Sequence, residues 1–171
     1  MPRVSTIEDK TPYQIRREEL GLSREQASEL LEVITPERIE RIESRKYIAH
    51  PDEVLIMAEK YQAPHLCNYY CANECAIGQE YVPEIKIKHL SQIVLEMLAS
   101  LGTVKKRQER LVEITADGII EENEIEDFIN IQEELERISI TVEALQLWAE
   151  RKIAAGDIDM EVYLTVKQKK S

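Results

Sequence analysis

Aromatic residues and glycine are scarce in this sequence: only 5% of its 171 residues are Phe, Tyr or Trp, and only five are glycine. Glutamate, leucine, isoleucine, lysine and arginine are frequent instead, a composition that favours helices over sheets. With 43% hydrophobic residues, the chain is long enough to bury a core in one domain or in two small ones. We therefore predict an all-α protein.

Positive charge is also in short supply. The formal net charge is -11, of which residues 1–66 carry -3 and the rest of the chain carries -8. Neither part has the excess of Lys and Arg that is typical of proteins binding nucleic acids through bulk charge. Any binding to DNA must therefore depend on a few well-placed residues.

Long apolar runs and catalytic motifs are missing as well. The N-terminus has no apolar signal core, and no run of about eighteen apolar residues occurs. We expect a cytoplasmic protein without a membrane partner. The sequence contains no glycine-rich phosphate loop, no serine elbow and no His-Glu-x-x-His. We do not expect an enzyme, and no cofactor or small-molecule ligand is indicated.

Helix-start signals divide the first 75 residues into five short helices. Thr11-Pro12 and Thr35-Pro36 each combine a capping threonine with a proline at the first helical position. Ser23 and Gln26 have the spacing of a capping box, and apolar residues follow at helical intervals. Two further helices are expected to open at His50-Pro51 and Ala63-Pro64. We predict one helical domain over residues 11–75.

The order of these segments resembles the repressor and Cro group, the xenobiotic-response-element (XRE) family of helix-turn-helix regulators. The resemblance is carried by Gly21 to Gln26, by Thr35 to Glu43 and by the basic pair Arg45-Lys46, and it covers residues 13–62. In that family the second helix sets against the phosphate backbone and the third lies in the major groove. The resemblance implies sequence-specific binding to double-stranded DNA and control of transcription.

The family's DNA-contacting positions can be carried over one by one. The residues implied are Ser23, Arg24, Thr35, Glu37, Arg38, Arg41, Arg45 and Lys46. Glu43 matches the glutamate that closes the family's third helix, and Arg16 or Arg17 is its expected partner. Glu32 and Arg45 stand where the family often has glycine.

Acidic residues on the predicted third helix favour a different function. Glu37, Glu40 and Glu43 balance its basic residues, and a carboxylate near phosphates is repelled unless it accepts from cytosine N4. The alternative to a DNA-binding regulator is a protein-binding adaptor or sensor that keeps the repressor fold.

Two long periodic segments follow the head domain. Their seams alternate steps of three and four: Leu90, Val94, Met97, Leu101, Val104, Gln108 and Leu111 on the first, and Phe128, Ile131, Leu135, Ile138, Val142, Leu145 and Ala149 on the second. The seams mirror each other about Ile119 and Ile120, which predicts a long antiparallel helical hairpin. We assign residues 76–86 to a linker, 87–153 to the hairpin and 154–171 to a tail with room for a short helix.

Apolar residues also lie off these seams, where two helices alone cannot cover them. They are Ile93, Leu98, Val112, Ile129, Ile140, Leu147 and Trp148. A second copy of the chain would bury them in a four-helix bundle, which predicts a homodimer that reads an inverted repeat. The alternative is that the hairpin folds back on its own N-terminal domain.

Two segments have some features of metal sites. Cys67, Cys71 and Cys75 would line one face of a continuous helix, where three thiolates with His65 could hold zinc or an iron-sulfur cluster, or sense redox state. Residues 113–124 have the glycine and the final glutamate of a calcium loop but lack the usual first and third ligands. Packing of cysteines and a tight inter-helix turn explain the same residues, so we predict no bound metal.

Overall fold

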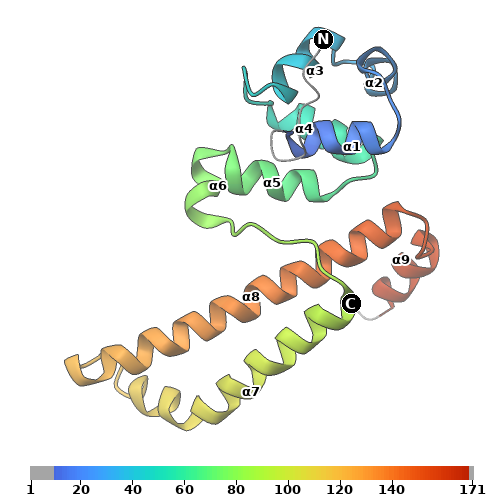
Figure 1. Cartoon of the computed structure of the whole chain (residues 1–171). Coiled ribbons are helices and arrows are strands. Elements are labelled where there is room, and N and C mark those ends of the chain that lie inside the picture. The colour runs from blue at the N-terminus through green and yellow to red at the C-terminus, as the bar shows by residue number, and fades with distance from the viewer. Residues whose placement is uncertain (1–9, 170–171) are drawn as a thin grey trace. The chain divides into compact units, whose positions relative to one another are not determined.

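The computed structural model describes residues 10–169, and this part of the chain is helical and contains no strand (Figure 1). The prediction of an all-α fold is confirmed. The chain divides into two compact units, one formed by residues 10–84 with 150–169 and the other by residues 85–149. None of the helices within residues 10–169 is both long and apolar enough to cross a membrane.

The first unit begins with five helices that start where the capping signals predict. They are α1 (Pro12–Glu19), α2 (Arg24–Leu31), α3 (Pro36–Glu43), α4 (Pro51–Lys60) and α5 (His65–Asn73). The hydroxyl of Thr11 accepts from the amide of Gln14, and that of Thr35 accepts from Arg38, both at 3.3 Å. Ser23 and Gln26 form both bonds of the capping box. These bonds satisfy amides that a helix N-terminus otherwise leaves without a partner.

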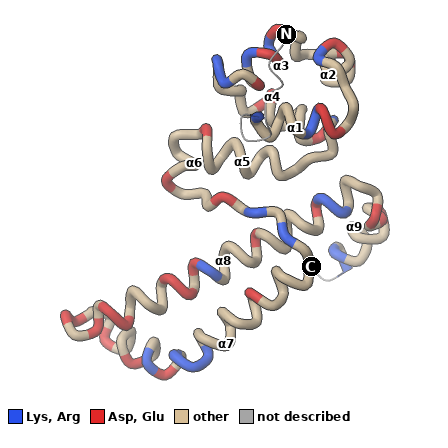
Figure 2. The backbone as a smooth tube through the Cα atoms, viewed as in Figure 1, with Lys and Arg blue, Asp and Glu red and all other residues tan. Residues whose placement is uncertain are grey.

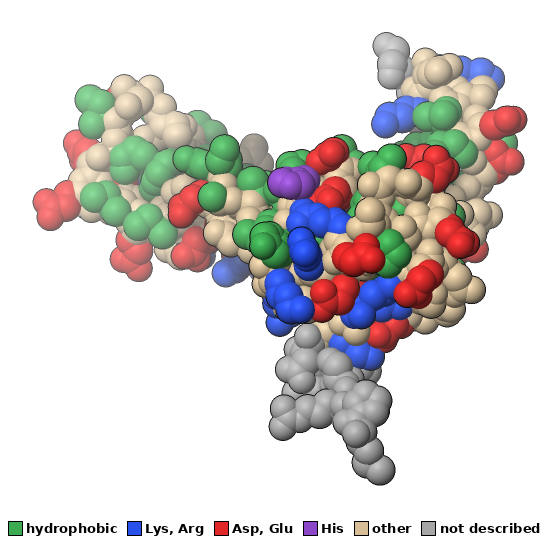
Figure 3. All heavy atoms as spheres, turned by 90° about the horizontal axis from the view of Figure 1, so that it is seen from above, with side chains coloured by type: hydrophobic (Ala, Val, Ile, Leu, Met, Phe, Trp, Pro, Cys, Tyr) green, Lys and Arg blue, Asp and Glu red, His purple; other side chains and the backbone are tan. Residues whose placement is uncertain are grey.

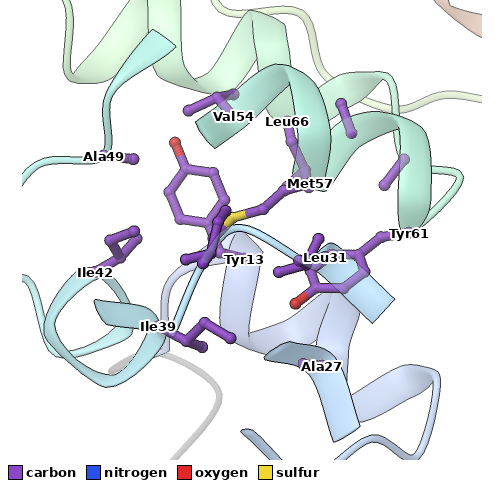
Figure 4. Packing of buried hydrophobic residues seen from close by; sticks show 13 residues of the cluster. Tyr13, Ala27, Leu31, Ile39, Ile42, Ala49, Val54, Met57, Tyr61 and Leu66 are labelled. Carbon is purple, nitrogen blue, oxygen red and sulfur yellow. The ribbon is translucent and has the colours of Figure 1, made fainter. Parts of the chain in front are cut away.

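One apolar core holds these five helices together. Figure 4 shows Tyr13, Ile39 and Met57, from α1, α3 and α4, converging on its centre. Leu31 from α2 and Leu66 from α5 are also fully buried in this cluster. Burial of each large apolar side chain contributes about 1.5–3 kcal/mol. The core therefore fixes how α2 and α3 are oriented relative to α1 and α4.

Two further helices belong to this unit. The segment predicted as a linker contains α6 (Ala76–Tyr81), which packs closely on α5: a Cβ on Gly78 would lie 2.0 Å from the carbonyl oxygen of Cys71. The segment predicted as a tail contains α9 (Met160–Gln168), capped by Asp159, whose side chain accepts from the amide of Val162 at 3.0 Å. Residues 170 and 171 of that tail lie outside the described residues.

The second unit holds the hairpin. Helix α7 (Leu90–Ile114) leads through a turn and the short 3-10 helix η2 (Glu122–Glu124) into α8 (Ile125–Ala154), whose last turn belongs to the first unit. Near the turn, basic residues at the end of α7 lie opposite acidic residues at the start of α8 (Figure 2). Arg110 donates to Asp127 at 2.7 Å and so ties the two arms together. Gly118 adopts a φ of 75°, which suits glycine in a tight turn.

On each arm of the hairpin, several buried residues lie one position before the residue predicted for the seam. Ile93 and Ser100 are buried where Val94 and Leu101 were expected, and on α8 Thr141 is buried instead of Val142. Five predicted seam residues are instead 38–47% exposed: Leu90, Val94, Leu101, Leu135 and Val142. Both arms are therefore rotated in the same sense relative to the prediction.

This rotation corrects two residues of the predicted dimer surface. Ile93 and Leu147 are only 1% and 8% exposed, because they form the hairpin's own core with Ile85 and Ala144. Their assignment to an intermolecular surface is wrong. Ile140 and Trp148 are partly buried against the same core, whereas Leu98, Val112 and Ile129 remain exposed on a single chain.

Candidate nucleic-acid interface

Helix α3 has one buried face and one exposed face. Ile39 and Ile42 point into the core, and Glu37, Arg41 and Ser44 lie at the helical spacing that leaves them in solvent. A four-residue connection joins this helix to α2, which also buries one face. The α2–α3 pair therefore has the form of a helix-turn-helix motif, and the outer surface of α3 is accessible to solvent.

A buried carboxylate fixes the α2–α3 pair to α1. Glu43 accepts from Arg17 Nε at 2.5 Å and from Arg17 Nη2 at 3.0 Å, and Arg24 Nε donates to it at 2.9 Å. Arg17 also donates to the carbonyl of Leu22 at 2.6 Å. The predicted partnership of Glu43 with an arginine of the first helix is confirmed, with Arg17 in that role. Such a fully bonded buried pair orients helices more than it stabilises them.

Tyr61 lies next to this ion pair without joining it. Burial, together with the charge of Glu43, raises the pKa of Tyr61 to about 12. Its hydroxyl is buried, and no group among the described residues bonds to it. A buried hydroxyl in this state costs stability.

Arg38 is occupied by an acidic residue at the start of α4. Its Nε and Nη2 each donate to Glu53 at 2.7 Å, and Nη2 also donates to the carbonyl of Ile48 at 3.1 Å. The pKa of Glu53 is lowered: burial opposes ionisation, but Arg38 and the amide of His50 outweigh it. Arg38 therefore links α3 to α4 and can reach a base only by leaving Glu53.

The basic segment after α3 is likewise engaged. Lys46 lies 2.8 Å from Glu40, and Arg45, which has a φ of 57°, acts electrostatically on Tyr69. The guanidinium of Arg41 lies 5.5 Å from the ring centroid of Tyr47, a cation–π contact. Tyr47 is exposed and was not predicted as a site residue, although an aromatic residue directly after a basic pair is a signal that could have identified it.

These contacts give the α2–α3 face a mixed charge. Figure 3, which views the molecule from the α2 and α3 end, shows Lys and Arg side chains interleaved with Asp and Glu. Arg24, Arg38 and Lys46 each lie against a glutamate. Ser23 and Thr35 use their side chains as helix caps, and Glu37 is exposed. The predicted residues thus gather around α2 and α3, but they do not form an unbroken positive rim.

The three cysteines do not share one helix. Cys67 and Cys71 lie on α5, whereas Cys75 is the N-cap of α6. Burial, reinforced by Cys71 and Glu150, raises the pKa of the Cys67 thiol, which disfavours a thiolate. Among the described residues, no cluster of three or more His, Cys, Asp or Glu side chains could hold a metal ion.

Comparison with known proteins matches residues 14–65 to the family described as helix-turn-helix. The matched span covers α1 through α4 and reaches the first residue of α5. No curated protein and no solved structure matches the chain. The family match suggests a DNA-binding regulator, in agreement with the α2–α3 geometry. Over residues 14–65, this chain is similar to the helix-turn-helix family.

Proposed function

We propose that this protein is a sequence-specific DNA-binding regulator of transcription that acts as a homodimer on an inverted repeat. The observation that carries the proposal is the α2–α3 pair, held by the Arg17–Glu43 pair and exposing one face of α3. A recognition helix needs this rigidity because its side chains must meet base edges in a fixed register.

Arg41 is the residue that we expect to read a base. Its side chain is exposed, and an aromatic ring holds it without neutralising its charge. Arginine commonly binds guanine O6 and N7 with two hydrogen bonds, and the exposed Glu37 can accept from cytosine N4. The capped N-termini of α2 and α3, at Ser23 and Thr35, suit phosphate oxygens. Arg45 and Lys46 would flank the groove.

Internal pairing of the basic residues should make non-specific binding weak. Arg24, Arg38 and Lys46 each already have a carboxylate partner, so contact with phosphate must compete with it. Non-specific affinity grows with the number of phosphates neutralised. Specificity would then depend on a few base contacts made by two heads, on half-sites about 34 Å apart.

The exposed apolar face of the hairpin supports the homodimer. On α7 this face comprises Leu90, Val94, Leu98, Leu101 and Val112, and on α8 it comprises Leu135 and Val142. Several large apolar side chains exposed along one helix face often mark a protein interface. A second copy offers the same two stripes, and joining them completes a four-helix bundle.

Selection of sites from a random DNA pool by the full chain tests the proposal. Arg41→Ala should lower affinity for the selected site by about 1–3 kcal/mol and relax the preference at one base pair. Arg137→Ala is the matched control, because it removes the same charge from an exposed position on α8. Enrichment of no sequence at low salt would reject DNA binding.

A second function is favoured by the glutamates that neutralise the α2–α3 face. With Arg24, Arg38 and Lys46 paired internally, this face suits a protein partner as well as DNA. The second candidate is therefore a protein-binding adaptor or sensor subunit. A folded, dimeric protein that selects no DNA sequence is the result that would favour it.

A further inference from the structure

We propose that an open groove in the first unit binds an amphiphilic organic cation, a ligand that goes beyond the proposed DNA-binding function. The groove has a volume of about 410 Å³ and is formed by α4, α5, the last turn of α8 and the first residue of α9. Small-molecule sites typically measure about 300–1,000 Å³. The groove is therefore large enough for a ligand of several rings or a branched apolar body.

Most of the lining is apolar. The apolar residues are Ala58, Pro64, Ile153, Ala154 and Met160. Ala58 is buried as part of the core of the first unit, so this side of the groove is rigid. Met160, which also lines the groove, is exposed, and its flexible thioether can adapt to the shape of a ligand. These residues predict a ligand with an apolar body.

Two carboxylates set the sign of charge that the groove accepts. Glu59 and Glu150 both line it, and neither has an ion-pair partner among the described residues. No lysine or arginine is among the residues that line the groove. The nearby cation Arg151 acts on His65, whose pKa is lowered mainly by burial and then by this charge. A bound cation would gain attraction from both carboxylates without displacing an existing partner.

Cys67 adds an uncharged thiol to the same groove. Burial raises its pKa, and the charge of Glu150 acts in the same direction. The sulfur therefore contributes polarizable apolar surface in its protonated form. An anionic ligand would meet two carboxylates and no cation, so the groove selects against it.

Isothermal titration of the full chain with two ions of nearly equal shape tests the proposal. Tetraphenylphosphonium should bind with one-to-one stoichiometry, and tetraphenylborate should bind at least about tenfold more weakly because only the sign of charge differs. Glu59→Gln and Glu150→Gln should each weaken binding of the cation by about three- to tenfold. Ala154→Phe should abolish binding by filling the groove.

Glu136→Gln is the matched control, because the protein's net charge of -11 attracts any cation. Glu136 is exposed on α8 and outside the groove, so its replacement should change the affinity by less than about twofold. Equal binding of both ions would overturn the proposal. The proposal would also be overturned if Glu136→Gln and the two groove variants lost equal affinity for the cation. Cation binding that survives Ala154→Phe, or no binding at millimolar tetraphenylphosphonium, would contradict it as well.

Discussion

Glu32 and Arg45 have positive φ angles of 65° and 57°, at the end of α2 and just after α3. Glycine adopts this region without steric cost, whereas other residues pay about 1–2 kcal/mol there. These are the two positions where glycine is common in the family that the sequence resembles. The turns after α2 and α3 therefore have a conformation suited to glycine, and the backbone is strained at Glu32 and Arg45.

We expect Glu32→Gly to raise the free energy of unfolding by about 1 kcal/mol, because it relieves that strain. The exposed ion pair with Lys60 contributes little in water. Urea unfolding followed by circular dichroism gives the measurement. Glu29→Gly is the control: at an exposed position inside α2, it should lower stability by about 1 kcal/mol. Equal losses in the two variants would show that position 32 is not strained.

Glu74 should make stability depend on pH. Burial raises the pKa of its carboxyl above the ordinary value of 4.5, although the hydroxyl of Tyr13 donates to it at 3.2 Å and Arg45 also lowers it. A carboxyl with a raised pKa in the folded state favours folding while it is protonated. That contribution is present below pH 4.5 and is lost as the pH rises through the raised pKa.

Replacing Glu74 with Gln removes this ionisation, so Glu74→Gln should gain stability relative to the wild-type protein as the pH rises from about 4 to about 7. Unfolding midpoints measured across that interval give the comparison. Glu80→Gln, an exposed change of the same charge on α6, serves as the control. A Glu74→Gln profile that stays parallel to the wild-type profile would contradict the expected sign.

At the scale of elements, the contact between α5 and α6 depends on one glycine. A Cβ at position 78 would lie 2.0 Å from the carbonyl oxygen of Cys71, and this obstacle is backbone that cannot rotate away. Helix α6 would have to move. We expect Gly78→Ala to lower the free energy of unfolding by about 1–3 kcal/mol, as measured by urea unfolding.

Gly102→Ala provides the comparison, because a Cβ at that position on α7 meets nothing within 4 Å. There the helix propensity of alanine should add about 1 kcal/mol of stability. If the two replacements have the same effect, then close packing at Gly78 does not hold α6 on α5.

The two hairpin arms show how polar residues come to face inward. Thr141 is buried on α8, and its hydroxyl donates to the carbonyl of Ile138 at 2.8 Å on the same helix. The hydroxyl group is thereby satisfied without a partner on α7. Because Thr141 is buried, its neighbour Val142 faces solvent. On α7, Ser100 is likewise buried and its neighbour Leu101 is exposed. The polar inner positions thus account for the apolar outer stripe.

For the whole molecule, this stripe predicts self-association. The wild-type chain should be a dimer at tens of micromolar, and the double change Leu98→Lys with Leu101→Lys should make it monomeric, because two charges cannot be buried in an apolar interface. Light scattering measures the mass. Leu55→Lys is the matched control, since Leu55 is an exposed leucine on α4 in the other unit. A monomeric wild-type chain, or dissociation in the control as well, would contradict this interface.

Local signals in the sequence were sufficient for much of the first unit. The caps at Thr11, Ser23 and Thr35 involve partners only three residues away, so each helix start follows from its own few residues. The arginine partner of Glu43 was also within reach, because the family resemblance supplied the role and α1 offered only two candidates. Helix α6 was missed because a six-residue helix carries little periodicity.

The sequence by itself determined the all-α class, the helix starts of the head domain and the existence of a long hairpin, because each depends on composition or on contacts a few residues apart. Only the tertiary structure decided that Ile93, rather than Val94, faces inward and that Arg38 is held by Glu53. Adjacent helical positions differ by about 100° around the axis, so a broad apolar stripe leaves the inward direction open until the partner helix packs. A side chain's ion-pair partner is likewise decided by residues that meet only in the folded chain.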